Sequence, residues 1–414
     1  NTAVGHNAMG DGITTANWNS AFGHNALKSV TTGYSNVAIG QAAGDAITTG
    51  YTNVAIGVEA LGACSTGANN VAIGVEALDA LTGADANTAV GRSALGANTT
   101  GYSNVAVGAY ALDACTTGQQ NNAFGHNALG AVTTGSYNCA FGEQSLYASS
   151  GSDNTGFGHR TLQANTTGGD NTAVGANALD ANTTGSDNTA LGKNCLGAST
   201  TATQNTCIGS QAGSQTNGGS NVYVGYYCGK DSDSGIYNTA LGHYAFSSDQ
   251  NGTTTGSYNT VLGSRAGQVI SSGNSNVLVG WEAGKGIQNG AFNVCIGPEA
   301  GGTGQITASD NQLYLARNNT GANNAATWIY GDSNGACYQG NNSSTWSTSS
   351  DIRLKKDIVD SPKGLNEINQ LRVTNFYYRE ENEIDMSEFP LAQEPREVCL
   401  ADEDKGGKLQ TGLI

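Results

Sequence analysis

The chain has 414 residues, of which 60 are glycine, 38% are hydrophobic and only 12% are charged, a composition that argues against two or three ordinary globular domains. Its formal net charge of -16 argues against a nucleic-acid partner, because phosphate binding needs clustered Lys and Arg. No apolar run approaches the roughly 20 residues that span a bilayer, and the first residues do not form a secretory signal, so we expect no membrane insertion.

A short motif recurs through the first 297 residues. An Asn, three residues centred on a small one, and a Gly are repeated eighteen times, as in Asn36-Val-Ala-Ile-Gly40 and Asn293-Val-Cys-Ile-Gly297, with a step of 17 residues and a few slips to 16, 18 or 21. Such a unit buries its apolar face only against its neighbours. We therefore predict an all-β fold in which residues 1–310 form a repetitive β-solenoid (β-roll) shaft of about eighteen turns. Because the chain begins on a repeat Asn, we expect the sequence to be a fragment.

The alternation of side chains within each repeat predicts a strand, since its period is two. We number positions from the repeat Asn, which is position 0. Position 3 is always large and apolar, whereas position 2 is Ala, Gly or Cys except at Tyr223, Val261 and Leu278. We expect the bulky side chains to interlock between turns of one chain. The Ala and Gly face is expected to pack against another chain, because small side chains allow close approach.

The remaining positions of the repeat predict the corners of the coil. Positions 7 and 8 are commonly Ala-Leu, and a Thr-Thr-Gly sequence such as Thr31-Thr32-Gly33 closes the turn. Gly is suited to corners with positive φ, and Asn is the next most tolerant residue. We expect both the repeat Asn and these glycines to serve such corners.

Cysteine and histidine positions follow the repeat as well. Cys207 and Cys295 occupy position 2, Cys195 and Cys228 position 7, and Cys64 and Cys115 position 11, with no C-x-x-C pair. We interpret them as buried small hydrophobic residues. All five His occupy position 5, which also accepts Trp281 and Lys193 and so indicates an exposed corner. We expect no metal and no cofactor.

The Asn-x-Ala-x-Gly strand followed by a turn of small residues resembles the head repeats of trimeric autotransporter adhesins and the β-roll shafts of phage tail fibres. Those repeats are shorter than 17 residues, so the resemblance bears more on the oligomeric state than on details of the fold. It implies a homotrimer.

Candidate receptor contacts lie on the outside of the predicted shaft. Tyr34, Tyr51 and Tyr102 each stand two residues before a repeat Asn, and aromatic faces stack on sugars and on partner proteins. The repeat that contains Asp249 and Asn251 is four residues longer than the others and predicts a protruding loop, because insertions in solenoids emerge on one face. We expect these five residues to be candidates for binding a host receptor, either a glycan or a protein.

The predicted repeat shaft ends at residue 310, and the composition changes near residue 346. Leu313-Tyr314-Leu315 and Trp328-Ile329-Tyr330-Gly331 predict short strands of a β-rich neck over 311–346. Ser361 and Pro362 then predict a helix start, with Leu365, Ile368 and Leu371 on one face. A further strand is expected between Val373 and Tyr378. We place a separate α+β segment at 347–414.

The sequence from Ser350 to Ile358, Ser-Asp-Ile-Arg-Leu-Lys-Lys-Asp-Ile, resembles the opening of the endosialidase-type intramolecular chaperone, a self-cleaving serine peptidase domain of phage tail fibres and tailspikes. The resemblance implies a trimerising folding aid that is cut off before the motif Ser. On this chain Ser350 would be the nucleophile, Lys355 its general base, and the bond between Ser349 and Ser350 the one cleaved. The chain ends at Gly412-Leu413-Ile414, near the start of a later family segment, so only the N-terminal part of the domain is expected.

These features favour a homotrimeric tail fibre of a phage virion that attaches to the host cell. A bacterial trimeric adhesin on the cell surface is one alternative. A tailspike that degrades polysaccharide is another, and it would require two carboxylates a few ångströms apart.

Overall fold

The computed structural model describes residues 1–10, 15–248, 252–302, 308–316, 327–339, 375–376 and 410–411. The chain divides into two compact units, Asn1–Trp346 and Ser347–Ile414. The predicted cleavage site and the expected helix after Ser361 lie outside the described residues.

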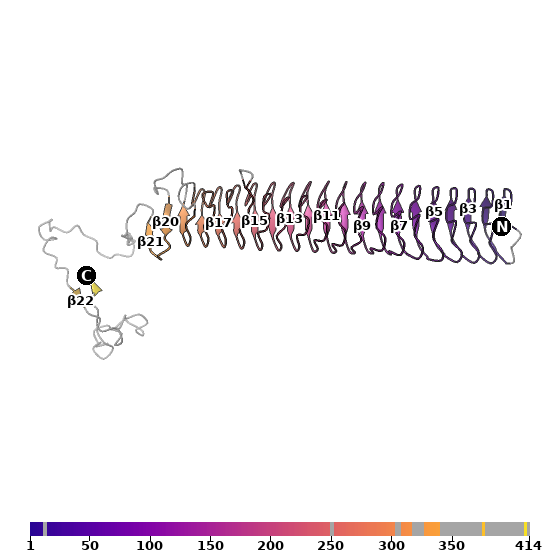
Figure 1. The fold of residues 1–414 in the computed structure, drawn as a ribbon, viewed down its shortest axis with the longest axis horizontal. Coiled ribbons are helices and arrows are strands. Elements are labelled where there is room, and N and C mark those ends of the chain that lie inside the picture. Colours follow the sequence, from indigo (N-terminus) through magenta and orange to yellow (C-terminus); the bar gives the residue numbers. More distant parts are fainter. Residues whose placement is uncertain are drawn as a thin grey trace, which may run out of the picture. The chain divides into compact units, whose positions relative to one another are not determined.

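The first unit is a parallel β-solenoid in which every turn contributes one strand of three residues at positions 1 to 3 (Figure 1). The strands are β1 (Thr2–Val4), β2 (Ser20–Phe22), β3 (Val37–Ile39), β4 (Val54–Ile56), β5 (Val71–Ile73), β6 (Thr88–Val90), β7 (Val105–Val107), β8 (Asn122–Phe124), β9 (Cys139–Phe141), β10 (Thr155–Phe157), β11 (Thr172–Val174), β12 (Thr189–Leu191), β13 (Thr206–Ile208), β14 (Val222–Val224), β15 (Thr239–Leu241), β16 (Thr260–Leu262), β17 (Val277–Val279) and β18 (Val294–Ile296). Each pairs with the next in parallel, with equivalent positions opposite one another, as in Ala38 and Ala55. The predicted all-β solenoid of about eighteen turns is confirmed.

The sheet continues into the predicted neck. Strand β19 (Leu313–Ala316) pairs in parallel with β18, and β20 (Thr327–Gly331) and β21 (Cys337–Gln339) then add antiparallel strands. In the second unit, β22 (Asn375–Phe376) pairs antiparallel with β23 (Gln410–Thr411). Within the described residues there is no helix, and therefore none with the length and hydropathy of a membrane span.

The predicted roles of the two strand faces were wrong. The middle residue of every strand from β2 to β18, usually Ala, is buried inside its own chain, whereas no side chain at position 3 is buried. Ile39, for example, is 42% exposed, and Ala38 beside it is 0% exposed. The solenoid is narrow, so small side chains fill its interior and the bulky ones point outward. We call positions 1 and 3 of β1 to β18 the outward face.

The interior is filled from the opposite side by position 8. Where position 2 is Ala, position 8 is usually a fully buried Leu, such as Leu27, Leu61 and Leu112. Where a large residue occupies position 2, position 8 is Gly: a Cβ on Gly229 would lie 2.5 Å from the Tyr223 ring, and one on Gly284 would lie 2.5 Å from Leu278. The exceptions at position 2 are therefore compensated across the core, because close-packed interiors conserve volume.

The repeat Asn has a different role from the one predicted. Its φ is not positive, and its buried side chain forms a hydrogen-bonded ladder along the rod. The Asn53 Nδ2 group donates to Asn36 Oδ1 at 3.1 Å and to the Gly67 carbonyl oxygen at 2.8 Å, while Asn53 Oδ1 accepts from the Asn70 backbone N–H at 2.9 Å. The ladder runs from Asn1 to Asn293 and ends on the Gln312 N–H. It satisfies backbone groups that would otherwise be buried without partners.

Glycine is required at two sets of positions for different physical reasons. At position 4, Gly has positive φ, such as 139° at Gly40, and a side chain there would also collide with the next turn. Glycines that end the Thr-Thr-Gly turns, such as Gly33, do not have positive φ; a Cβ there would collide with the Gly50 carbonyl oxygen. The positive φ predicted for that turn was therefore wrong, and close approach of successive turns explains the residue.

Candidate functional site

The tyrosines predicted to contact a receptor are exposed but do not form one continuous surface. Tyr34 and Tyr51 stack with ring centroids 5.0 Å apart and planes at 5°. Tyr102 is also exposed, but it lies three turns further along the same column. Asp249 and Asn251 lie outside the described residues. Of the three predicted receptor-contact residues that the structure describes, Tyr34 and Tyr51 contact each other and Tyr102 lies apart from them.

The histidines occupy an exposed corner, as predicted. All five are exposed, and His6 stacks on His24 at 5.2 Å. In the part of the chain that the structure describes, no group of three His, Cys, Asp or Glu side chains is placed to hold a metal ion.

A denser group of aromatic side chains lies at positions 5 and 6 of two consecutive turns. Tyr226 stacks on His243 with centroids 5.6 Å apart, and Tyr227 stacks on Tyr244 with centroids 4.9 Å apart. The two stacks meet nearly at right angles, at 77° between Tyr226 and Tyr227 and 77° between His243 and Tyr244. We call these four residues the aromatic corner. None of the four was among the predicted receptor contacts, although adjacent ring-bearing residues after the Gly of two successive repeats were a signal.

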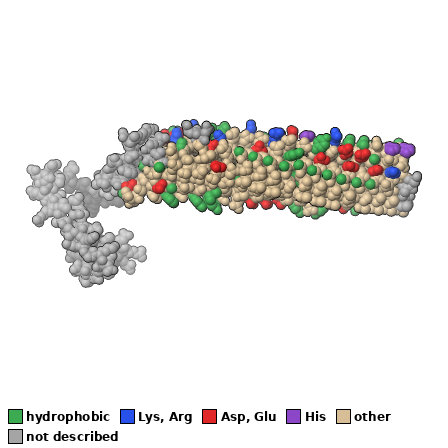
Figure 2. All heavy atoms as spheres, viewed as in Figure 1, with side chains coloured by type: hydrophobic (Ala, Val, Ile, Leu, Met, Phe, Trp, Pro, Cys, Tyr) green, Lys and Arg blue, Asp and Glu red, His purple; other side chains and the backbone are tan. Residues whose placement is uncertain are grey.

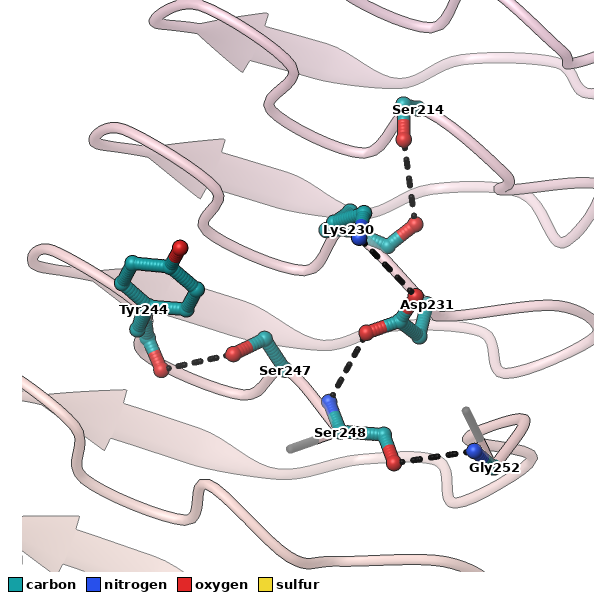
Figure 3. Close-up of polar contacts among 7 residues, drawn as sticks. All are labelled: Ser214, Lys230, Asp231, Tyr244, Ser247, Ser248 and Gly252. Carbon is teal, nitrogen blue, oxygen red and sulfur yellow. Dashed lines mark hydrogen bonds and ion pairs between the residues drawn. The ribbon is translucent and has the colours of Figure 1, made fainter. Parts of the chain in front are cut away.

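Polar groups lie beside the aromatic corner on the side of the longer turn, and Figure 3 draws them together with Tyr244 of the corner. The Lys230 ammonium lies 5.0 Å from the centre of the Tyr227 ring and 3.9 Å from Asp231 Oδ1. Asp231 also accepts a hydrogen bond of 3.1 Å from the Ser248 N–H, at the start of the insertion. Burial raises the pKa of Asp231, and Lys230 opposes that rise. The insertion is thus attached to the turn that carries Lys230.

A group of half-buried carboxyl groups lies elsewhere on the rod, at position 9. Burial raises the pKa of Asp79, and the neighbouring Glu59 and Glu76 raise it further. Burial also raises the pKa values of Asp45 and Asp113. Figure 2 shows acidic side chains gathered in small groups on a surface that is mostly uncharged.

Six cysteines of the shaft behave as small core residues, as predicted, whereas Cys139, at position 1 of β9, is half-buried on the outward face. Cys64, Cys115, Cys195, Cys207, Cys228 and Cys295 are free and buried. Burial raises the pKa of Cys64 and Cys115 to about 11 and that of Cys228 and Cys295 to about 12. Cys337 is free and exposed.

Thiol reactivity should follow this difference. When the native chain is treated with iodoacetamide at about pH 8, we expect alkylation of Cys337 and none of Cys64, Cys115, Cys228 or Cys295, because only an accessible thiolate reacts. Raising the pH to about 9.5 should not change the pattern, since that remains below the raised pKa values. Peptide mass spectrometry measures the modified sites. Alkylation of Cys64 or Cys115 in the folded rod would contradict the packing described.

The second compact unit contains the sequence that matched a known family. Residues 350–399 match the family model of the chaperone of endosialidase. A comparison with curated proteins returned no match.

The chaperone of endosialidase match and the solenoid together fit a phage tail fibre-like protein. The predicted nucleophile Ser350 and general base Lys355 fall within the matched range but outside the described residues, so their roles stay predictions.

Proposed function

We propose that this chain is the shaft of a homotrimeric phage tail fibre, a virion protein that attaches to the host cell. The observation that carries the proposal is a solenoid in continuous register from β1 to β19 in a chain whose residues 350–399 match the chaperone of endosialidase. A rod of uniform cross-section extends a binding surface away from the particle, and a chaperone assists the slow assembly of long-range β structure.

The outward face supports the homotrimer. Position 3 carries Val, Ile, Leu or Phe in all eighteen strands, and nine of these side chains are more than a third exposed: Val4, Phe22, Ile39, Ile73, Phe157, Leu191, Ile208, Leu241 and Ile296. A continuous apolar stripe of this length is unusual on a soluble monomer. Burial of the outward faces of three chains against one another would remove it from water. The Ala face cannot serve this purpose, because it is already inside the chain.

The segment from 347 onward is proposed to assist trimer assembly and then to be released. Lys355 would take the hydroxyl proton of Ser350, and the Ser350 oxygen would attack the carbonyl carbon of Ser349. Proton transfer to the Ser350 nitrogen would break the peptide bond, leaving a free amine on Ser350 and an ester between Ser349 and the Ser350 oxygen. Water would then hydrolyse the ester. A lysine can act as base only if its pKa is lowered, which burial would achieve.

Self-cleavage can be tested with the full-length gene. Wild type is expected to yield a shortened shaft ending at Ser349, whereas Ser350→Ala and Lys355→Ala should remain uncut. Lys356→Ala is a matched control, because the neighbouring lysine is not assigned a role, and it should be cut normally. Intact mass spectrometry of the purified products measures the outcome. The dyad assignment is wrong if both variants give the wild-type product.

Host attachment has a separate test. Labelled wild-type fibre is applied to a panel of Gram-negative and Gram-positive strains, and adsorption to at least one is expected. A trimeric fibre that adsorbs to no strain and does not compete with phage adsorption would contradict the attachment role.

A further inference from the structure

We propose that the aromatic corner, formed by Tyr226, Tyr227, His243 and Tyr244, binds an uncharged pyranose saccharide of the host surface, with Lys230 and Asp231 as its polar border. The inference rests on the proposed attachment function and assigns it a place and a ligand class. It differs from the sequence-based candidates Tyr34, Tyr51 and Tyr102.

The first observation is the density of rings. Exposed aromatic stacks elsewhere on the rod each follow one column of side chains, as Tyr34 with Tyr51 and Tyr237 with Tyr258 do. At the aromatic corner two columns are aromatic in the same two turns, and Tyr226 is 46% exposed. Ring faces and edges at right angles provide an apolar surface against which the C–H groups of a sugar ring can pack.

The second observation is the backbone conformation. Tyr227 and Tyr244 have φ of 56° and 53°, a left-handed region that bulky residues avoid. Other turns fill the same left-handed position with Asn, as at Asn127 and Asn177, or with Glu, as at Glu59 and Glu76, and Asn is the non-glycine residue best suited to it. Replacing Tyr227 and Tyr244 with Asn would therefore keep this backbone conformation and remove only the rings.

The third observation is the polar border. Lys230 contacts the Tyr227 ring face and Asp231, and Asp231 accepts from the Ser248 N–H of the longer turn. Asp231 is buried and holds the Lys230 ammonium in place, so the Lys230 side chain, which is 33% exposed, is the donor available to sugar hydroxyl groups. Figure 3 shows Lys230, Asp231, Tyr244 and Ser248 grouped on adjacent turns.

Charge selects the class of saccharide. The ionic groups near the corner are paired with one another: Lys230 with Asp231, and both Arg265 and Lys285 with Glu282, at 3.4 and 3.0 Å. These ion pairs leave no excess of positive or negative charge at the corner that would favour a charged ligand. An uncharged saccharide is therefore favoured over a polyanion, which the chain's net charge of -16 would repel.

The test measures binding of the trimeric protein to immobilised neutral oligosaccharides of glucose, galactose, mannose and N-acetylglucosamine. Binding to polygalacturonate, a negatively charged polysaccharide, is measured for comparison. We expect wild type to bind at least one neutral oligosaccharide. Tyr227→Asn with Tyr244→Asn should weaken binding about tenfold or more, since each ring contact contributes about 0.5–1.5 kcal/mol. The fold should persist, because Asn suits the left-handed backbone. Tyr110→Asn, at the same position of a turn without an insertion, should bind as wild type does.

Several outcomes would overturn the proposal. These are failure of wild type to bind any neutral oligosaccharide, equal binding by the double variant, or preference for polygalacturonate. If wild type adsorbs to cells and the double variant does not, yet no oligosaccharide binds, the corner contacts a protein. If the double variant loses trimerisation, the corner is a subunit contact. Equal adsorption of wild type and double variant to cells rejects this inference and leaves the attachment function standing, whereas absence of wild-type adsorption rejects the attachment function itself.

Discussion

Replacing Asn121 with Ala is expected to open the solenoid around β7 to β9. The Asn121 Nδ2 group donates to Asn104 Oδ1 at 3.2 Å and to the Gly135 carbonyl oxygen at 2.9 Å, and its Oδ1 accepts from the Asn138 N–H at 3.0 Å. Alanine leaves the Gly135 carbonyl oxygen and the Asn138 N–H buried without these partners. At about 1–3 kcal/mol for each unsatisfied group, local stability should fall by about 2–6 kcal/mol.

Hydrogen exchange with mass spectrometry measures this effect turn by turn. Protection of residues 104–138 should fall by a factor of 30 or more, while distant turns keep theirs, because solenoid stability is a sum over neighbouring repeats. Asn122→Thr is the matched control: Asn122 is exposed, and Thr occupies its place in β10, β11 and β12. It should leave exchange unchanged.

Asn121→Asp adds a pH dependence that Ala lacks. Burial should raise the pKa of the new carboxyl group, and the ionised form would present an acceptor, in place of the Nδ2 donor, to the Gly135 carbonyl oxygen. Since the folded state then binds the proton more tightly than the unfolded state does, stability is greatest at low pH and is lost as pH rises through the folded-state pKa. Equal destabilisation of Asn121→Ala and Asn122→Thr would contradict the ladder.

Charging the outward face is expected to convert the fibre into monomers. The design places Lys and Glu alternately at position 3 of six consecutive strands, β6 to β11, replacing Val90, Val107, Phe124, Phe141, Phe157 and Val174. Within one chain each new charge lies beside an opposite one on the next turn, which preserves the ladder. Around a threefold axis, however, three identical charges would meet at every turn.

The expected loss is large. Removing six half-buried apolar side chains per chain, at about 1 kcal/mol each, weakens association by about 6 kcal/mol, or roughly 10⁴-fold, before repulsion is counted. Sedimentation should show monomers with unchanged β-sheet circular dichroism. The same alternating charges at position 5 of these turns, on the exposed corner, are the control and should leave the trimer intact. Persistent trimers after charging of the outward face would place the interface elsewhere.

The sequence was sufficient to predict the repeat, the strand at positions 1 to 3 and the neck strands, because period-two alternation and a constant step are local properties. It could not decide which face was inside. Ala55 and Ile56 differ in size, and either could line a core; the choice depends on how wide a 17-residue turn is once Leu61 of the same turn fills it from the other side. The usual association of bulk with burial therefore gave the wrong answer.

The functional residues also divide into those that the sequence revealed and those that it did not. The role of Asn53 was missed because the prediction explained each repeat Asn by the backbone conformation of its own turn. The amide ladder forms only where the side chains of successive turns contact one another. The aromatic corner was missed because Tyr227 and Tyr244 are adjacent only across turns. Ser350 and Lys355 were found from a motif alone, and their geometry lies outside the described residues.

Native mass spectrometry of the wild-type fibre, compared with the mass of the denatured chain, tests the central claim most directly. Three solenoids joined along their outward faces predict a native mass three times the chain mass, which for the uncut chain of 42.0 kDa is 3 × 42.0 = 126 kDa. A native mass equal to that of one chain, from a protein that retains its β-sheet circular dichroism, would contradict the account.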